Sequence, residues 1–140
     1  MTSPFGDRDS RDWWQGLQDG QLRLQHCRDC STYRWAPRAM CNECGSFAWE
    51  WSPVDGSATV VSWTLSRRAY TPGYEPPYVV VLVRLEAAPN VLMVGGWNGG
   101  GIEGELAVGL PVVPSFVELG TTHDGPGTLV FWRPAVGTSA

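Results

Sequence analysis

The chain has 140 residues, a formal net charge of −4 and a pI near 5.0, so it has room for one ordinary domain or a small module joined to one domain. All ten basic residues are arginines, and the longest basic run is Arg67-Arg68, so we expect no nucleic-acid partner. No apolar run approaches the ~20 residues of a membrane span, and the N-terminus lacks an apolar signal core. We therefore expect a cytoplasmic protein with no membrane partner.

The N-terminal third predicts a helix and a metal-bound ribbon. Residues 1–9 are expected to be a disordered tail or linker, and residues 10–52 the helix and ribbon. Ser10 or Asp12 would cap a helix that ends near Asp19-Gly20. Its apolar stripe is too short to be stable alone, so it must dock on its own domain or on a partner chain. Both alternatives stay open for the stripe, which consists of Trp13, Trp14 and Leu17.

Two Cys-x-x-Cys pairs, separated by ten residues, are the most informative motif of the chain: Cys27, Cys30, Cys41 and Cys44. In a reducing compartment such pairs are typical metal ligands rather than disulfides. Four thiolates close a tetrahedron around Zn²⁺ and leave no position for water or substrate, so we predict a structural zinc ion. Iron of the rubredoxin type is the alternative. Gly45 suits the left-handed turn of such a loop, and Ser31 replaces the easier glycine in the first loop.

The flanking sequence predicts strands. Leu22 and Leu24 alternate with polar residues before the first pair, and Phe47, Trp49 and Trp51 alternate after the second pair. Residues 53–135 are expected to form a five-stranded OB-fold barrel, and residues 136–140 a tail. The barrel strands are predicted at 58–65, 78–85, 91–94, 112–117 and 129–132, with one helical turn or two at 102–107. The fold class is therefore mainly β.

Three local features of the sequence add detail to the predicted barrel. The β-branched run at 78–85 is expected to be buried on both faces. Gly95-Gly96 is expected to break or bend its strand, and Pro114 to mark an edge or a bulge. The proline-rich loop at 66–77 is either an ordinary connection or a binding loop.

Catalytic groups are sparse. There is no lysine, the cysteines are assigned to metal, and the histidines are His26, beside a cysteine, and His123, in a polar turn. A lone histidine without a placed partner is weak evidence for catalysis, so we name no catalytic residue. Eight tryptophans are many for this length, which favours an interaction subunit because large aromatic side chains anchor interfaces.

The order of these motifs resembles the acyl-CoA-associated family that joins a rubredoxin-like zinc ribbon to an OB-fold. The resemblance covers residues 12–135, and its most specific parts are Pro37-Arg38 after the first cysteine pair and the ending Phe131-Trp132-Arg133-Pro134-Ala135. Ser31 and Pro114 depart from the family pattern. Members are small partners of thiolase-superfamily enzymes. Some help an acetoacetyl-CoA thiolase pass its product to HMG-CoA synthase, and others bind a thiolase-like aldolase as the tail of a steroid-degrading enoyl-CoA hydratase.

The resemblance implies a non-catalytic accessory subunit in a hetero-oligomer with a thiolase-like enzyme, most specifically a steroid side-chain retro-aldolase, with acyl-CoA near the interface. Arg67 and Arg68 are candidates for binding the CoA phosphates. A stand-alone acyl-CoA or lipid-carrier module is the alternative function, and a nucleic-acid-binding ribbon is a less favoured one. The candidate interface residues are Trp13, Trp14, Leu17, Tyr70, Tyr74 and Trp97.

Overall fold

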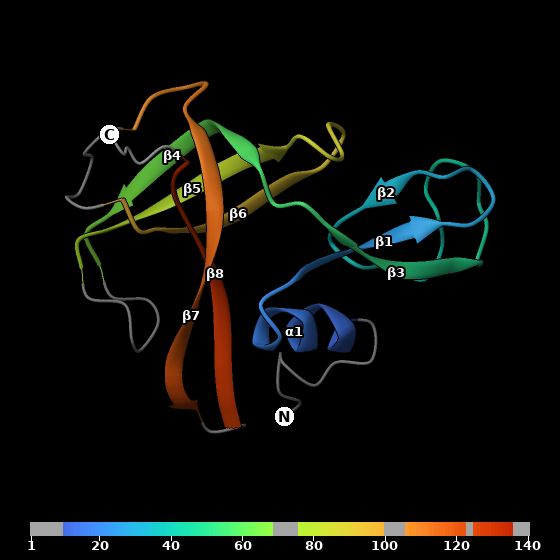
Figure 1. Ribbon diagram of the computed structural model, residues 1–140, viewed down its shortest axis with the longest axis horizontal. Helices are drawn as coiled ribbons and strands as arrows, with labels where there is room; N and C mark the ends of the chain where they lie inside the picture. The colour runs from blue at the N-terminus through green and yellow to red at the C-terminus, as the bar shows by residue number, and fades with distance from the viewer. Residues whose placement is uncertain (1–9, 69–75, 100–105, 123–124, 136–140) are drawn as a thin grey trace.

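A computed structural model describes residues 10–68, 76–99, 106–122 and 125–135. It contains one helix, a small three-stranded sheet and a closed five-stranded barrel, with the helix between the two β units (Figure 1). The small sheet has the order β2-β1-β3, and the barrel has the order β4-β5-β6-β8-β7. This arrangement confirms the predicted mainly β class and the OB-type barrel. The elements are α1 (Arg11–Gln18), β1 (Leu22–Cys27), β2 (Tyr33–Arg34), β3 (Trp49–Val54), β4 (Ala58–Ser66), β5 (Tyr78–Leu85), β6 (Leu92–Trp97), β7 (Pro111–Thr122) and β8 (Gly125–Pro134).

One apolar core joins the helix, the ribbon and the barrel. Leu22 and Leu24 of β1 are buried together with Trp13 and Leu17 of α1, in the same cluster as the barrel interior. The predicted domain boundary at residues 52–53 stays a prediction, and it falls inside β3. The shared core places α1 against both β1 and β8, so the helix is held by its own chain.

The chain passes from ribbon to barrel through a tight contact at Gly56. A Cβ added there would collide with Cγ of Pro114 and would lie 3.1 Å from Cδ1 of Leu22. Pro114 lies in β7 opposite Trp132 of β8, two residues beyond the pairing of Val112 with Ala58. The proline therefore lies beyond the short β4–β7 pairing, where its missing N–H costs no hydrogen bond to β4.

Strand β5 alternates instead of being buried on both faces as predicted. Val79, Val81, Val83 and Leu85 point into the barrel, while Arg84 is exposed and Tyr78, Val80 and Leu82 are half-buried. A strand in a barrel has one face toward the interior and one toward its surroundings, so a continuous apolar run is not evidence for two covered faces.

Strand β6 continues through Gly95-Gly96, so the predicted break is wrong. Gly95 pairs with Val81, and Gly96 pairs with both Val80 of β5 and Phe131 of β8. A Cβ on Gly95 would lie 2.6 Å from Nε1 of Trp132. The glycines are therefore required by close packing against β8.

Three further predictions differ from the structure or fall beyond it. Phe47 lies outside β3 and is 71% exposed, although the alternating pattern placed it in that strand. Strand β8 is longer than the predicted 129–132. The predicted helical turn at 102–107 falls mainly outside the described residues, and 106–107 are not helical.

Candidate metal centre and binding surfaces

The two cysteine loops have the same backbone hydrogen bonds. In the first loop the N–H of Ser31 donates to the Cys27 carbonyl over 3.0 Å. In the second, the N–H of Gly45 donates to the Cys41 carbonyl over 2.8 Å. Ser31 has a φ of 63° and Gly45 a φ of 78°, so each loop uses one left-handed residue to turn its cysteine pair to one side.

The four sulfur atoms have the spacing of a tetrahedral metal site. All four Sγ atoms lie within 4.8 Å of one another, and two cross-loop pairs, Cys27–Cys44 and Cys30–Cys41, are each 3.6 Å apart. A tetrahedron with Zn–S bonds of about 2.3 Å has sulfur atoms about 3.8 Å apart. The cysteines are therefore positioned to bind a metal ion, consistent with a structural Zn²⁺, and four thiolates fill its coordination sphere.

The pKa values of the Cys27, Cys41 and Cys44 thiols depart from their ordinary range because of backbone hydrogen bonds, desolvation and the neighbouring sulfurs. The backbone N–H of Cys30 lowers the pKa of the Cys27 thiol to about 6 against the desolvation of that group. The N–H groups of Cys44 and Glu43 also lower the pKa of Cys41. The N–H of Ser46 lowers the pKa of Cys44, but desolvation and its three sulfur neighbours outweigh that bond and raise this pKa to about 12. A cation is needed for all four sulfurs to be thiolates at neutral pH.

A buried polar network supports the ribbon beside the metal site. Gln25 is fully buried and Arg34 is 5% exposed. Oε1 of Gln25 accepts hydrogen bonds from Nε of Arg34 over 2.7 Å and from the backbone N–H of Arg38 over 2.9 Å. The Arg34 guanidinium also donates to the Arg38 carbonyl and lies over the Trp49 ring. The sequence did not predict this network. In an alternating strand, the polar Gln25 is expected on the face that points to solvent.

The ribbon and the barrel are also joined by a hydrogen bond. The Asn90 side chain, in the connection between β5 and β6, donates to the Tyr33 carbonyl of β2 over 2.8 Å. Arg84 of β5 donates to the Pro89 carbonyl in the same connection. These bonds fix the position of the cysteine loops relative to the barrel.

The candidate phosphate-binding arginines border an open depression at one end of β4 and β5. Arg67 and Arg68 are exposed, and the depression has a volume of about 800 Å³. The other residues that line the depression are Tyr78 and Val80 of β5 and Thr64, Leu65 and Ser66 of β4. The structure therefore brings the two arginines together with one aromatic ring.

The candidate interface residues have different surroundings. Trp13 and Leu17 are 4% and 1% exposed in their own core, so docking of the helix on its own chain accounts for both. Trp14 is half-buried beside them. Trp97 is half-buried, packs against the core and covers Gly99. Tyr70 and Tyr74 lie outside the described residues, as does His123.

Other apolar side chains are exposed in places that the sequence analysis did not identify. Leu92 and Val94 of β6 are 40% and 50% exposed, and they lie on the same side of that strand. Val108 is 74% exposed, and Met40 and Phe47 are exposed beside the second cysteine pair. The sequence predicted a strand at 91–94, but it did not predict that one side of the strand would be partly uncovered.

A four-cysteine ribbon joined to a closed five-stranded OB-type barrel defines the class of zinc-ribbon and OB-fold proteins. Residues 14–50 match the rubredoxin-like zinc ribbon domain of ChsH2, and residues 51–117 match the C-terminal OB-fold domain of ChsH2. The chain is 31% identical to one in a solved structure named "Ltp2-ChsH2(DUF35) aldolase", with a TM-score of 0.81 over 96% of this chain and 100% of that one. The chain therefore belongs to the ChsH2 family of DUF35 proteins.

Two curated relatives are hydratase subunits. The chain is 33% identical over 95% of its length to the "Probable enoyl-CoA hydratase alpha subunit" of Thermomonospora curvata. It is 29% identical over 84% of its length to the 3-oxo-4,17-pregnadiene-20-carboxyl-CoA hydratase alpha subunit of Mycobacterium tuberculosis. The chain spans 40% and 37%, respectively, of the lengths of these two proteins.

A DUF35-family protein of unknown function from Sulfolobus solfataricus is similar in fold alone. Its solved structure is 13% identical to this chain, with a TM-score of 0.61 over 94% of the chain and 88% of that structure. Among the described residues, no helix has both the length and the apolar character needed to cross a membrane.

Proposed function

We propose that the chain is a non-catalytic accessory subunit that binds a thiolase-like aldolase and supports retro-aldol cleavage of a steroid side-chain β-hydroxyacyl-CoA. The main support is its similarity, over 96% of its length, to the whole DUF35 chain of the "Ltp2-ChsH2(DUF35) aldolase" structure. In such a cleavage the bond between Cα and Cβ breaks, the hydroxyl carbon becomes a carbonyl, and Cα of the acyl-CoA takes up a proton. The partner enzyme would supply the reacting groups.

The uncovered side of β6 is a candidate docking surface for that partner. Leu92 and Val94 are exposed there, and Leu82 of β5 lies beside Val94 in register. Apolar surface of this kind is stabilised when another protein covers it. Trp14 at the edge of α1 adds an aromatic side chain that is only partly covered by its own chain.

The test is co-expression with a thiolase-like protein encoded beside this chain, followed by size-exclusion chromatography and an aldol-cleavage assay. We expect the two chains to co-elute, and the enzyme to lose most of its activity without this chain. Leu92→Asp should weaken the complex at least ~10-fold, since an interface charge would lose its hydration. Ser62→Asp, at an exposed β4 position, is the matched control. Separate elution and equal activity of the enzyme alone would contradict the proposal.

For the CoA moiety we assign Arg67 and Arg68 to the phosphates. A guanidinium matches the geometry of phosphate oxygens, and the Tyr78 ring beside the arginines offers a stacking surface for an adenine base. Calorimetry with CoA should show weaker binding by about tenfold for Arg67→Ala or Arg68→Ala, the loss expected for one charge-assisted hydrogen bond. Arg133→Ala changes an exposed arginine on β8, away from the depression, and is the control. Equal CoA affinity of all three variants and the native chain would remove this assignment.

A stand-alone acyl-CoA carrier is the alternative function. The observation that favours it is an apolar pocket beside α1. The same co-expression experiment separates the two functions. A carrier binds acyl-CoA but elutes alone, whereas an accessory subunit elutes with the enzyme.

A further inference from the structure

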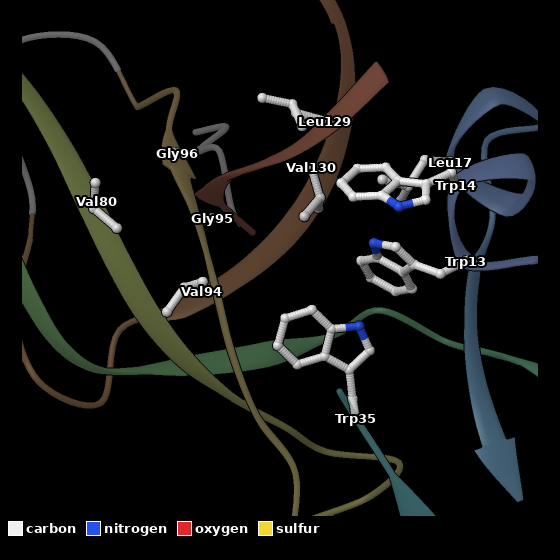
Figure 2. Close-up of a pocket in the computed structure, with 10 residues that line it drawn as sticks. All are labelled: Trp13, Trp14, Leu17, Trp35, Val80, Val94, Gly95, Gly96, Leu129 and Val130. Carbon is white, nitrogen blue, oxygen red and sulfur yellow. The ribbon is translucent and has the colours of Figure 1, made fainter. Parts of the chain in front are cut away.

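An apolar pocket of about 240 Å³ lies between α1 and the barrel. Figure 2 shows three indole rings from Trp13, Trp14 and Trp35 along one wall, facing the β5 and β6 strands on the other. The rings of Trp13 and Trp35 are in contact, with their centroids 5.3 Å apart. The remaining lining residues are Leu17, Val80, Val94, Gly95, Gly96, Leu129 and Val130.

The pocket lies where α1 packs beside β8, next to the short pairing of β6 with β8. In the described strands their register consists of Gly96 with Phe131 and Trp97 with Trp132. The helix α1 packs against β8, and its side chains close one side of the pocket. Gly95 and Gly96 line the pocket with their backbone, because the rings of Trp132 and Phe131 lie where a Cβ would be.

The pocket adjoins the basic depression across β5. Val80 lines both of them: on one side the pocket continues to Val94 and Gly96, and on the other the depression continues to Arg67 and Arg68. Val94, on the β6 side, is 50% exposed, so the pocket is open to solvent at this residue. An apolar pocket and a cationic depression are thus separated by a single strand.

We propose that this pocket binds the apolar part of the acyl group of an acyl-CoA whose phosphates lie on Arg67 and Arg68. Acyl-CoA has the matching distribution of chemistry: an anionic nucleotide end, a polar pantetheine arm and an apolar chain. Each methylene buried in the pocket strengthens binding by about fourfold until the pocket is full. The inference rests on the proposed CoA site and adds the location and apolar nature of the group that the chain recognises.

The experiment measures the affinity of the zinc-loaded full chain for CoA, acetyl-CoA, hexanoyl-CoA and decanoyl-CoA by calorimetry, with decanoate as the probe without a nucleotide. We expect decanoyl-CoA to bind at least ~10-fold more tightly than CoA, given about fourfold per buried methylene. Val94→Trp places a large ring at the mouth of the pocket and should abolish this dependence on chain length while leaving CoA affinity unchanged. Leu92→Trp, two residues earlier on the same side of β6 and outside the pocket lining, should retain it.

Indole N–H resonances in a ¹⁵N-correlated spectrum give a second readout that needs no variant. Decanoyl-CoA should shift the signals of Trp13, Trp14 and Trp35, whereas CoA should leave them in place. Equal affinity for CoA and decanoyl-CoA, no binding of either, or equal effects of Val94→Trp and Leu92→Trp would overturn the inference. Co-elution with the thiolase-like enzyme is scored separately, so a failure of the pocket and a failure of the accessory role give different results.

Discussion

Ser31 and Gly45 occupy equivalent positions in the two cysteine loops, and both have positive φ angles, 63° and 78°. Each residue donates its backbone N–H to the carbonyl of the first cysteine of its loop. Only glycine adopts this conformation without steric cost, and an L-residue pays about 1–2 kcal/mol for it. The first loop therefore contains a strained residue where the second does not.

Ser31→Gly is expected to stabilise the folded chain by about 0.5–1 kcal/mol, because the relief of strain exceeds the entropy that glycine adds to the unfolded chain. Denaturant unfolding at a fixed free zinc concentration measures the change. The matched control is Gly45→Ala: nothing lies within 4 Å of a Cβ at that position, so its expected loss of about 1 kcal/mol comes from the backbone alone. Destabilisation by Ser31→Gly would show that the Ser31 hydroxyl stabilises the folded chain by more than the strained backbone destabilises it.

Gln25→Leu is expected to destabilise the chain by about 3 kcal/mol, because it leaves the buried Arg34 guanidinium without its Nε acceptor. Gln25→Glu keeps an acceptor at the same place and should retain most of the stability. Adding Arg34→Met to Gln25→Leu should recover part of the loss, since the uncompensated charge is then gone. If Gln25→Leu unfolds at the same denaturant concentration as the native chain, the network does not support the ribbon.

The contrast between the cysteines and Gln25 shows how far the sequence alone could predict this molecule. The ribbon was predictable because its ligands are close in sequence and their spacing determines a metal geometry. The barrel class followed from regularly spaced strands and turns. Burial of Gln25 was not predictable, because it depends on Arg34 lying opposite it in β2, and that pairing is set only when the ribbon closes.

The binding surfaces were less predictable than the fold for the same reason. The sequence showed that Trp13, Trp14 and Leu17 form one stripe, but not that Trp13 and Leu17 would be buried against β1 and the barrel. The pocket depends on how α1 packs beside β6 and β8, and the pairing of distant parallel strands leaves no local signal. The sequence predicted that Gly95-Gly96 would break or bend the strand. In the structure the two glycines leave room for the Trp132 and Phe131 rings.

Zinc affinity should fall as the pH is lowered, because protons compete with the metal for the sulfurs. The Cys44 thiol, with a pKa near 12 in the metal-free chain, must release its proton on binding across the neutral range. The Cys27 thiol, with a pKa near 6, is already a thiolate at pH 8 and becomes a further competitor below pH 6. Each released proton changes the affinity about tenfold per pH unit, so the dependence should steepen below pH 6. Competition with a chelator of known affinity at pH 5, 6, 7 and 8 measures this, and a flat profile would contradict it.

Gly95→Ala is expected to destabilise the barrel by about 1–3 kcal/mol, the usual cost of overpacking a core. The new methyl group would lie 2.6 Å from Nε1 of Trp132 and 2.8 Å from the Val130 carbonyl, and neither can move far, since Trp132 is fully buried and Val130 belongs to β8. Val94→Ala, at the preceding half-exposed residue, should cost much less and is the control. Thermal unfolding in the presence of zinc compares the two variants. A native melting temperature for Gly95→Ala would contradict this prediction. It would mean that β6 and β8 can separate further at this point, despite the close contact between Gly95 and Trp132.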